Sequence, residues 1–392
     1  MLALKWLIHS HNNKAQFNNI LNVMRALYFS DKDISKLNEC LKQLDKEKET
    51  KSILFLMADA EHYSDDELMP LLNTCSTPIL GGLFPELIFE GKRKKKGVLL
   101  LPLLFELKTQ VFDLSQNGDV CLKQMEAIHK DSMNQLSSLF VFVDSLASRK
   151  SQFMESLFNF FGVNTTYIGG SAGSLSFEKL ACIISNKGIH KNAAVIGWVN
   201  KKMALGVAHG WKSFSEILKV TETDKNIVKT LNWKPAFQIY KEIIDSHSGL
   251  KLTTDNFSEI VESYPLGIEK LDAEMIVRDP FKCCNNELHF IDSIQQGEYV
   301  KVLHGDLESL IEGASVARER ALSQLDKEMA QDSIFCIDCI SRVIFMKDLY
   351  SKELEVISKN KKVSGVLTIG EIANEGDSFL EIYNKTIVLA VW

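Results

Sequence analysis

The stretch from Tyr167 to Trp211, YIGGSAGSLSFEKLACIISNKGIHKNAAVIGWVNKKMALGVAHGW, decides the fold of this chain. A strand-like run leads into Gly169-Gly170, and further strand-like runs end at His209-Gly210-Trp211. The same order of features occurs earlier, over residues 77–114, where Gly81-Gly82 takes the place of Gly169-Gly170. Self-similarity of this kind indicates a duplicated structural unit.

The apolar runs before the two glycine pairs extend the repeat. Residues 53–58 and 139–143 are continuous apolar runs, which is the pattern of strands buried on both faces. A helical pattern follows each run, after Ser64 in the first copy and over residues 150–161 in the second. The sequence therefore predicts a duplicated β-α-β-β-β unit. A weaker third copy begins near residue 334, with a strand at residues 365–372 that contains Gly370, and the pattern leaves its existence open.

Helical spacing of apolar residues predicts four further helices. These are expected at residues 15–28, 34–44, 235–245 and 307–328. The fold class is mixed α/β, with duplicated units that form mixed sheets flanked by helices. We expect an N-terminal helical segment over residues 1–50 and two domains over residues 51–230 and 231–392.

The composition is that of an ordinary globular protein, with 45% hydrophobic and 24% charged residues. A net charge of −6 gives no overall attraction to nucleic acid or to anionic lipid. The apolar runs are too short to span a membrane, and the N-terminus does not resemble a secretory signal. The eight cysteines have no framework spacing, which predicts reduced thiols and a cytoplasmic location.

Motifs for common catalytic sites are absent from the sequence. Residues 169–173 resemble a nucleotide loop, but residues 174–182 read as a strand rather than the helix that holds a phosphate. A tight turn is the better interpretation. Cys336 and Cys339 fall on an expected strand and would point to opposite faces, so buried thiols are favoured over a zinc site. We therefore do not expect an enzyme.

His209 ends an apolar strand beside Gly210 and Trp211. It is either a hydrogen-bonded structural residue or a ligand-facing imidazole able to bind haem iron, with glycine leaving space for the macrocycle. His62, His289 and His304 are weaker candidates. Two arginines in apolar surroundings, Arg278 and Arg342, either hold a carboxylate or form internal ion pairs.

An ordered series of short motifs resembles the FIST family, with its N-terminal and C-terminal domains, from about residue 51 to the end. The motifs are Gly169-Gly170-Ser171-Ala172-Gly173, Ala193-Ala194-Val195, His209-Gly210-Trp211, Val220-Thr221, Pro235-Ala236 with Tyr240, Pro265-Leu266-Gly267, Arg278-Asp279-Pro280, Cys336-x-x-Cys339-x-x-Arg342, Gly370-Glu371-Ile372 and Asn384-Lys385-Thr386.

The resemblance implies a sensory, ligand-binding module of signal transduction. In length and layout the chain is similar to the stand-alone, NosP-type haem proteins of this family, which sense nitric oxide. That similarity implies haem b. We expect His209 to bind its iron, with Trp211 beside it and Arg278 or Arg342 near the propionates. It also implies a histidine kinase, or a diguanylate cyclase or phosphodiesterase, as partner. A homo-oligomer is a further option. The wider ligand pocket is expected to include Gly169, Gly170, Cys336, Gly370 and Glu371.

Two positions depart from the family pattern. Ser174 stands where an acidic residue often follows the glycine turn, and Asn232-Trp233 stands where Asp-Gly usually precedes the helix. Either departure can change the ligand. Two alternatives to haem therefore stay open, namely a FIST module that binds an amino acid or another small carboxylate, and a protein-interaction scaffold without a ligand.

Overall fold

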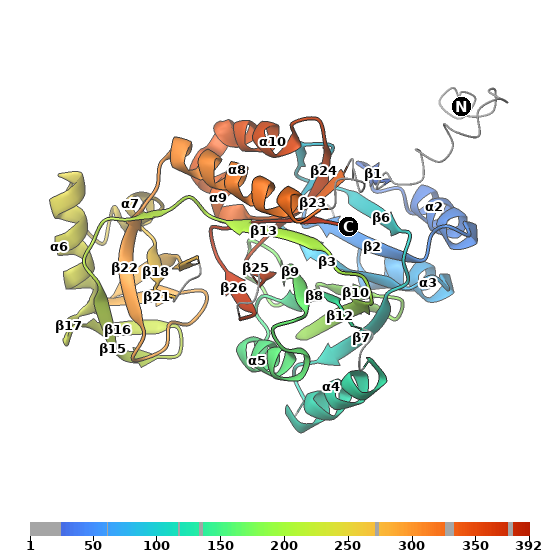
Figure 1. The fold of residues 1–392 in the computed structure, drawn as a ribbon, viewed down its shortest axis with the longest axis horizontal. Coiled ribbons are helices and arrows are strands. Elements are labelled where there is room, and N and C mark those ends of the chain that lie inside the picture. Colours follow the sequence, from blue (N-terminus) through green and yellow to red (C-terminus); the bar gives the residue numbers. More distant parts are fainter. Residues whose placement is uncertain are drawn as a thin grey trace.

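The computed structural model describes residues 25–60, 62–116, 118–132, 136–270, 274–325, 333–374 and 379–392. Within this part of the chain the strands form three six-stranded mixed sheets and one nine-stranded sheet. Figure 1 shows the three six-stranded sheets together in one body, with the nine-stranded sheet beside it. The mixed α/β class with helices flanking mixed sheets is confirmed.

Each six-stranded sheet is built around two parallel strands joined by a helix, with a third strand antiparallel to the first. The three sets are β2 (Ser52–Ala58), β3 (Ile79–Phe84) and β6 (Val98–Leu103); β8 (Ser138–Asp144), β9 (Thr166–Ala172) and β12 (Ala193–Val199); and β23 (Ser333–Cys339), β24 (Lys362–Thr368) and β27 (Ile387–Val391). The third copy of the repeat is therefore present. All three first strands are fully buried, as their continuous apolar runs predict.

The three repeats complete each other's sheets in a cycle. Each repeat contains a hairpin that pairs in another repeat's sheet: the first repeat's hairpin pairs with β24, the second's with β3 and the third's with β9. These hairpins are β4 (Glu86–Phe89) with β5 (Lys92–Lys94), β10 (Ile183–Ser185) with β11 (Gly188–His190), and β25 (Glu371–Ala373) with β26 (Glu381–Tyr383). Each sheet also has an outer strand. These are β1 (Leu27–Phe29), which pairs with β6; β7 (Lys108–Asp113), which pairs with β12; and β13 (Ala204–Ala208), which pairs with β27. No repeat has a complete sheet alone. We call the body formed by the three six-stranded sheets and their helices the core, and we expect it to fold as one unit.

Helices cover the sheets at equivalent points of each repeat (Figure 1). They are α2 (Ile34–Lys46) and α3 (Asp65–Thr74), α4 (Gly118–Ser132) and α5 (Lys150–Phe161), and α8 (Leu307–Ser323) with α9 (Ile340–Met346), the short 3-10 helix η2 (Lys347–Leu349) and α10 (Tyr350–Ser358). Asp33 and Ser64 cap α2 and α3 as polar N-cap residues do. The helix expected at residues 15–28 is wrong at its end, where Leu27–Phe29 forms β1; residues 15–24 lie outside the described part.

The glycine pairs do not form turns, which corrects the prediction made from the sequence. Gly81 and Gly169 lie inside β3 and β9, and Gly365 holds the same position in β24. A Cβ added at these three glycines would lie 1.8, 1.7 and 1.8 Å from a backbone oxygen of the neighbouring parallel strand. Glycine is needed there because the strands approach closely. Gly365, rather than Gly370, is therefore the third repeat's counterpart.

The chain after the second glycine pair also differs from expectation. Residues 174–182 contain no strand, and β10 begins at Ile183. The backbone turns at Gly173, whose φ of 149° lies in the region that favours glycine.

A separate unit is inserted between β13 and α8, within the third repeat. Its sheet contains β14 (Lys212–Ser213), β15 (Leu218–Asp224), β16 (Ile227–Leu231), β17 (Lys234–Pro235), β18 (Leu266–Ile268), β19 (Ile276–Arg278), β20 (Pro280–Cys284), β21 (Glu287–Phe290) and β22 (Tyr299–His304). The helices α6 (Ala236–Ser248) and α7 (Phe257–Val261) accompany this sheet. The division expected between residues 230 and 231 falls inside β16, and the third core sheet uses strands from both sides of it.

Candidate functional site

His209 lies directly after β13 and is only 2% exposed. Its Nδ1 accepts a hydrogen bond of 2.9 Å from the backbone N–H of Trp211, and its Nε2 lies 3.2 Å from Glu274 Oε1. Burial lowers the pKa of His209 to about 4, although Glu274 opposes this shift. These contacts fit a neutral imidazole that carries its proton on Nε2. Both ring nitrogens already face a protein group.

Arg342, on α9, is fully buried and all of its contacts lie within the core. It donates to the backbone oxygens of His209 at 2.6 Å, Leu310 at 3.0 Å and Lys385 at 3.2 Å. Its guanidinium also pairs with the carboxylates of Glu353 and Asp338. Burial alone would lower the pKa of Arg342, but these two carboxylates raise it above its ordinary value. Arg342 therefore joins the segments around it instead of facing a cavity.

Trp211 belongs to the same cluster. Its indole N–H donates to Lys385 O at 3.1 Å, and the Lys385 ammonium lies 5.0 Å from the ring centroid. Lys385 Nζ also lies 3.2 Å from Asp279 Oδ2 in the inserted unit. The structure thus brings together His209, Trp211 and Arg342, as packed residues.

Arg278 lies apart from them, at a second contact between the core and the inserted unit. It donates to Ile382 O at 2.9 Å and to Val277 O at 3.1 Å. Near it, Asp292 contacts Lys150 Nζ at 2.6 Å and Asn384 Nδ2 at 2.9 Å. Burial would raise the pKa of Asp292, but Lys150 and Arg278 hold it below its usual range. Arg278 therefore donates to backbone oxygens, and the carboxylate of Asp292 pairs with Lys150.

The five residues expected in the wider pocket are buried in sheets or beside them. Glu371 pairs with Gly170 across β25 and β9, next to Gly370. Its carboxylate accepts from Thr368 Oγ1 at 2.7 Å, and burial raises its pKa to about 8. Gly169 packs on β8 as described above. Cys336 lies within β23 opposite Gly365, away from the Gly170–Glu371 pair in the strand order. No set of three metal-binding side chains occurs among the described residues, which include both Cys336 and Cys339.

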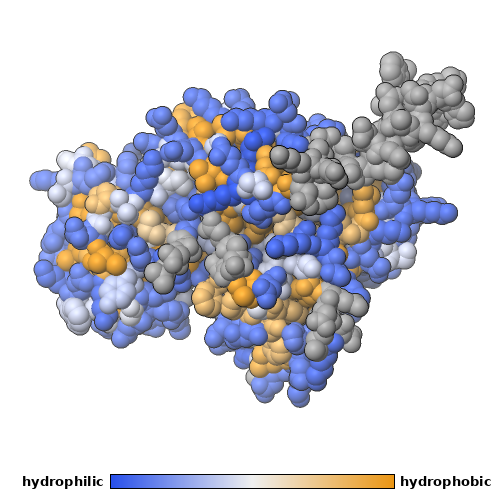
Figure 2. All heavy atoms as spheres, viewed as in Figure 1, coloured by the Kyte–Doolittle hydropathy of each residue, from blue (hydrophilic) through white to orange (hydrophobic). Residues whose placement is uncertain are grey.

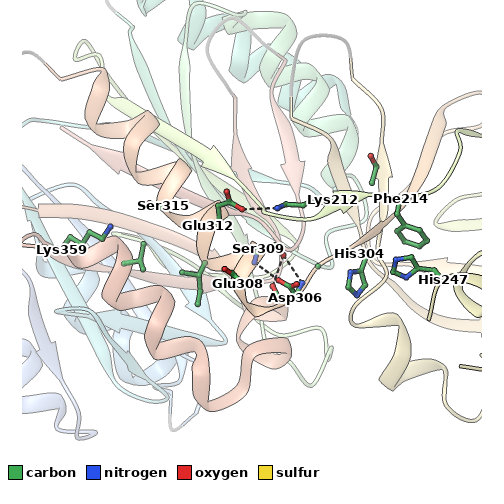
Figure 3. Close-up of a pocket in the computed structure, with 14 residues that line it drawn as sticks. Lys212, Phe214, His247, His304, Asp306, Glu308, Ser309, Glu312, Ser315 and Lys359 are labelled. Carbon is green, nitrogen blue, oxygen red and sulfur yellow. Dashed lines mark hydrogen bonds and ion pairs between the residues drawn. The ribbon is translucent and has the colours of Figure 1, made fainter. Parts of the chain in front are cut away.

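A cleft of about 640 Å³ opens immediately after this packed region, where the inserted unit meets the core (Figure 3). None of the nine main residues predicted from the sequence lines it, but His304, one of the weaker histidine candidates, does. Its lining comes from β14 and the following residue, α6, the end of β22, the first turns of α8, and the end of α10 with the residue beyond it. These residues are Lys212, Ser213, Phe214, His247, His304, Gly305, Asp306, Glu308, Ser309, Ile311, Glu312, Ser315, Val356 and Lys359.

Charges of both signs face each other in the cleft. Lys212 Nζ lies 3.2 Å from Glu312 Oε2, and the two side chains are 70% and 64% exposed. Figure 3 shows this pair near the centre, with Lys359 at one end and His304, His247 and Phe214 at the other. The cleft therefore offers a cation and an anion within reach of a single small molecule.

Aromatic rings form the end of the cleft that belongs to the inserted unit. The centroids of Phe214 and His247 are 3.9 Å apart, and those of His247 and His304 are 5.1 Å apart. His247 Nδ1 lies 3.1 Å from the Tyr264 hydroxyl. Burial, together with the nearby His247, lowers the pKa of His304, and Asp306 opposes the shift. His304 is therefore neutral near pH 7.

Helix α8 forms the core side of the cleft. Asp306 caps this helix by accepting from Ser309 N at 2.8 Å, and Ser309 Oγ accepts from Asp306 N at 3.0 Å in return. The reciprocal cap fixes where the helix begins, directly after β22 and His304. In the sequence this signal was readable as Asp-x-x-Ser after a strand, but nothing local connects it to Lys212 or His247.

The residues around His209 do not fit a haem group. Nδ1 of His209 already accepts from Trp211 N, and the ring is enclosed. Its buried Nε2 lies beside Glu274 and has no hydrogen-bond partner among the described residues, but the enclosing groups leave no room for a macrocycle there. The space expected beside Gly210 is filled by α8, because a Cβ at Gly210 would lie 2.2 Å from Ser309 O. The glycine serves close packing of a helix on the chain rather than access for a macrocycle.

Comparison with known proteins gives two domain matches and one relative. Residues 52–234 match the FIST N domain, and residues 236–374 match the FIST C domain. An uncharacterised protein of Methanocaldococcus jannaschii, MJ1623, is 22% identical over 209 residues, which are 49% of this chain and 38% of that protein. The two domain matches meet at residue 235, inside the inserted unit. None of the described helices is both long and apolar enough to cross a membrane.

Proposed function

Because the chain belongs to the FIST family, whose domains are sensory modules of signal transduction, we propose that it senses a small zwitterion of the amino-acid type. The proposed binding site is the cleft between the core and the inserted unit. The sequence already raised an amino-acid ligand as an alternative to haem. We now place its binding site at Lys212 and Glu312 instead of at the buried arginines Arg278 and Arg342.

The observation that carries the proposal is the ion pair across the cleft. An amino acid presents a carboxylate and an ammonium a few ångströms apart, and Lys212 and Glu312 present the complementary charges 3.2 Å apart. Exposed ion pairs contribute little to stability, about 0–1 kcal/mol, so a ligand can replace this one at small cost. Each charge then gains a charge-assisted hydrogen bond to the ligand.

The rest of the cleft supports a ligand with a side chain. Phe214 and His247 form an aromatic wall of two tilted rings in contact, and His304 adds a neutral imidazole able to donate or accept one hydrogen bond. A volume of about 640 Å³ is within the range of small-molecule sites. Most of its lining is charged or polar, with Phe214, Ile311 and Val356 as the apolar residues, which suits a small zwitterion better than an apolar ligand.

Signalling requires that the ligand binds one conformation better than another. Lys212, Phe214 and His247 belong to the inserted unit, whereas Glu312 and Lys359 belong to the core. A ligand that contacts both bodies favours the arrangement in which they are held together. The proposed partner that reads this arrangement is a histidine kinase, or a diguanylate cyclase or phosphodiesterase, as the family resemblance implies.

Haem and nitric oxide form the competing proposal, and a scaffold without a ligand is the third. The close packing around His209 disfavours haem binding at that residue. The open cleft with its pair of opposite charges disfavours a scaffold without a ligand. The purified protein distinguishes the three through its absorption spectrum with added haem and its thermal stability with each proteinogenic amino acid. A Soret band that disappears in His209→Ala would support haem.

Calorimetric titration of matched variants tests the cleft itself. Lys212→Met and Glu312→Gln each remove one charge, and each should weaken binding roughly 10- to 100-fold, the value of a charge-assisted hydrogen bond. Lys229→Met is the matched control, because Lys229 forms a similar exposed pair with Glu222 at 3.4 Å on the inserted sheet. Failure of every amino acid to bind, or equal binding by all variants, would refute the proposal.

A further inference from the structure

The inserted unit exposes an aromatic patch that the cleft does not use. The patch consists of Lys219 on β15, Tyr299 on β22 and Trp233 at the β16–β17 turn, and Ile217 directly precedes β15. Trp233 is 77% exposed, and Tyr299 and Ile217 are 48% and 45% exposed. The face in Figure 2 is mainly hydrophilic, with hydrophobic residues in separate groups. Exposed clusters of large apolar side chains of this kind mark interaction surfaces more often than isolated ones do.

Trp233 is held in a conformation that tryptophan disfavours. Its φ is 60° and that of Asn232 is 49°, so both turn residues are left-handed. Asparagine tolerates this region, but a bulky side chain does not adopt it readily. Strain of this kind persists only where the surrounding structure enforces it, and it is found preferentially at functional sites.

Three hydrogen bonds enforce the turn. Trp233 N donates to Thr221 Oγ1 at 3.0 Å, Asn232 N donates to Lys219 O at 2.9 Å, and Lys219 N donates to Asn232 Oδ1 at 2.8 Å. The turn is therefore fixed against β15, and the indole is presented to solvent by a rigid support. Rigid aromatic residues lose little freedom on binding, which is why they act as anchors in interfaces.

The charge of the patch defines what can cover it. Lys219 Nζ lies 6.0 Å from the Trp233 ring centroid and 5.9 Å from that of Tyr299, so one ammonium sits between two rings. In the described ranges neither Lys219 nor the neighbouring Lys234 forms an ion pair. Two unpaired cations beside two flat apolar surfaces complement carboxylates next to apolar side chains.

We propose that the aromatic patch docks an acidic segment of a partner protein, in which carboxylates flank an apolar residue. The apolar residue lies against Trp233 and Tyr299, and the carboxylates face Lys219 and Lys234. A sugar fits less well, because the Asn232 side-chain oxygen already accepts from Lys219 N and the patch offers few free acceptors for hydroxyl groups. The site is separate from the cleft, so this proposal stands without the proposed ligand.

Trp233→Gly is the decisive variant, because glycine relieves the left-handed strain and the variant is expected to fold at least as well. The probes are two pools of synthetic peptides of equal length and equal leucine and proline content. One pool is rich in aspartate and glutamate, and the other has asparagine and glutamine in their place. Fluorescence anisotropy of labelled peptides measures binding to the full-length protein.

We expect the acidic pool to bind the unmodified protein, and binding to weaken at least roughly 30-fold in Trp233→Gly. Lys219→Gln should reduce the salt dependence of binding. Leu104→Ala is the control, because Leu104 is an apolar side chain that is 51% exposed and lies outside the inserted unit. This variant should bind the acidic pool like the unmodified protein. Equal binding of both pools, or unchanged binding in Trp233→Gly, would overturn the proposal.

Other occupants give different results in the same comparison. A dimer in sedimentation velocity that dissociates in Trp233→Gly would assign the patch to a second copy of this chain. Trp233-dependent binding to vesicles of anionic lipid would assign it to a membrane surface. Either outcome, without selective binding of the acidic pool, would overturn docking of an acidic partner.

Discussion

The enclosed cluster around His209 and the open cleft that begins at Lys212 are neighbours in the chain, yet their chemistry differs completely. In the cluster, Trp211 and Arg342 donate to backbone oxygens, His209 Nδ1 accepts from Trp211 N, and none of the three side chains lines the cleft. In the cleft, Lys212 and Glu312 meet in solvent, and the aromatic wall has space in front of it. The difference indicates two separate roles: the cluster fixes the base of the inserted unit on the core, and the cleft is free to bind a ligand.

Replacing Arg342 should have the largest effect on stability. Arg342→Met leaves the carboxylate of Glu353 buried without its cation, at a cost of about 3–5 kcal/mol in the free energy of unfolding. Asp338 adds less, because burial raises its pKa well above the usual value and favours its neutral form. Urea denaturation measures this loss. Adding Glu353→Gln should recover part of it, because one uncompensated charge is then removed. A loss below about 1 kcal/mol would contradict the role of Arg342 as the centre of the cluster.

The second effect compares two glycines with positive φ. Gly210 has φ 83° and its added Cβ would lie 2.2 Å from Ser309 O, whereas Gly249 has φ 69° and nothing within 4 Å. Gly249→Ala should therefore cost only the conformational strain, about 1–2 kcal/mol. Gly210→Ala also forces α8 away from the chain and should cost several kcal/mol, with weaker ligand binding in the cleft. Thermal unfolding of both variants measures the difference, and equal losses would refute the close packing.

Acid should weaken the cluster through His209. Its pKa is about 4 in the folded protein and 6.5 in the ordinary state, so the unfolded chain binds the extra proton first as pH falls. Stability from this group is complete above pH 6.5 and is lost towards pH 4, by about 3 kcal/mol. Glu371 acts in the opposite direction, because burial raises its pKa from 4.5 to about 8. Its contribution to the free energy of unfolding is therefore lost as pH rises from 4.5 to about 8.

Comparison with His209→Gln isolates the histidine, because Glu371 is present in both proteins. Urea denaturation between pH 4 and pH 7 should show a shallower pH dependence in the variant. Parallel curves for the two proteins would mean that His209 is not a buried neutral imidazole.

Changes in the cleft should have the smallest effect on stability. Glu312 and Lys212 are mostly exposed, so Glu312→Gln should change the free energy of unfolding by less than about 0.5 kcal/mol while it weakens ligand binding. Chemical denaturation and calorimetry on one sample separate the two effects. A large loss of stability would place Glu312 with the structural residues.

Local sequence patterns predicted many of the strands and helix starts correctly. The continuous apolar runs at 53–58 and 139–143 became β2 and β8, and Ser64 caps α3 as its position predicts. The glycine pairs were misread because their role is close approach to a strand distant in sequence, which no local pattern encodes. The exchange of hairpins among repeats was hidden for the same reason.

The site could be predicted only in part. The sequence identified residues that come together, His209, Trp211 and Arg342, but residue type cannot reveal that neighbouring elements enclose them. The cleft combines Lys212, His247, His304 and Lys359, which come from distant parts of the chain and form no motif. The Asn232-Trp233 departure from the family pattern was visible, whereas the strain and exposure of Trp233 needed coordinates.

The most direct test of this division is NMR of the histidine ring signals during titration with the amino acid that gives the largest thermal shift. The cleft account predicts that the signals of His247 and His304 move, and that the signal of His209 stays where it is. Movement of the His209 signal, with those of His247 and His304 unchanged, would contradict the account.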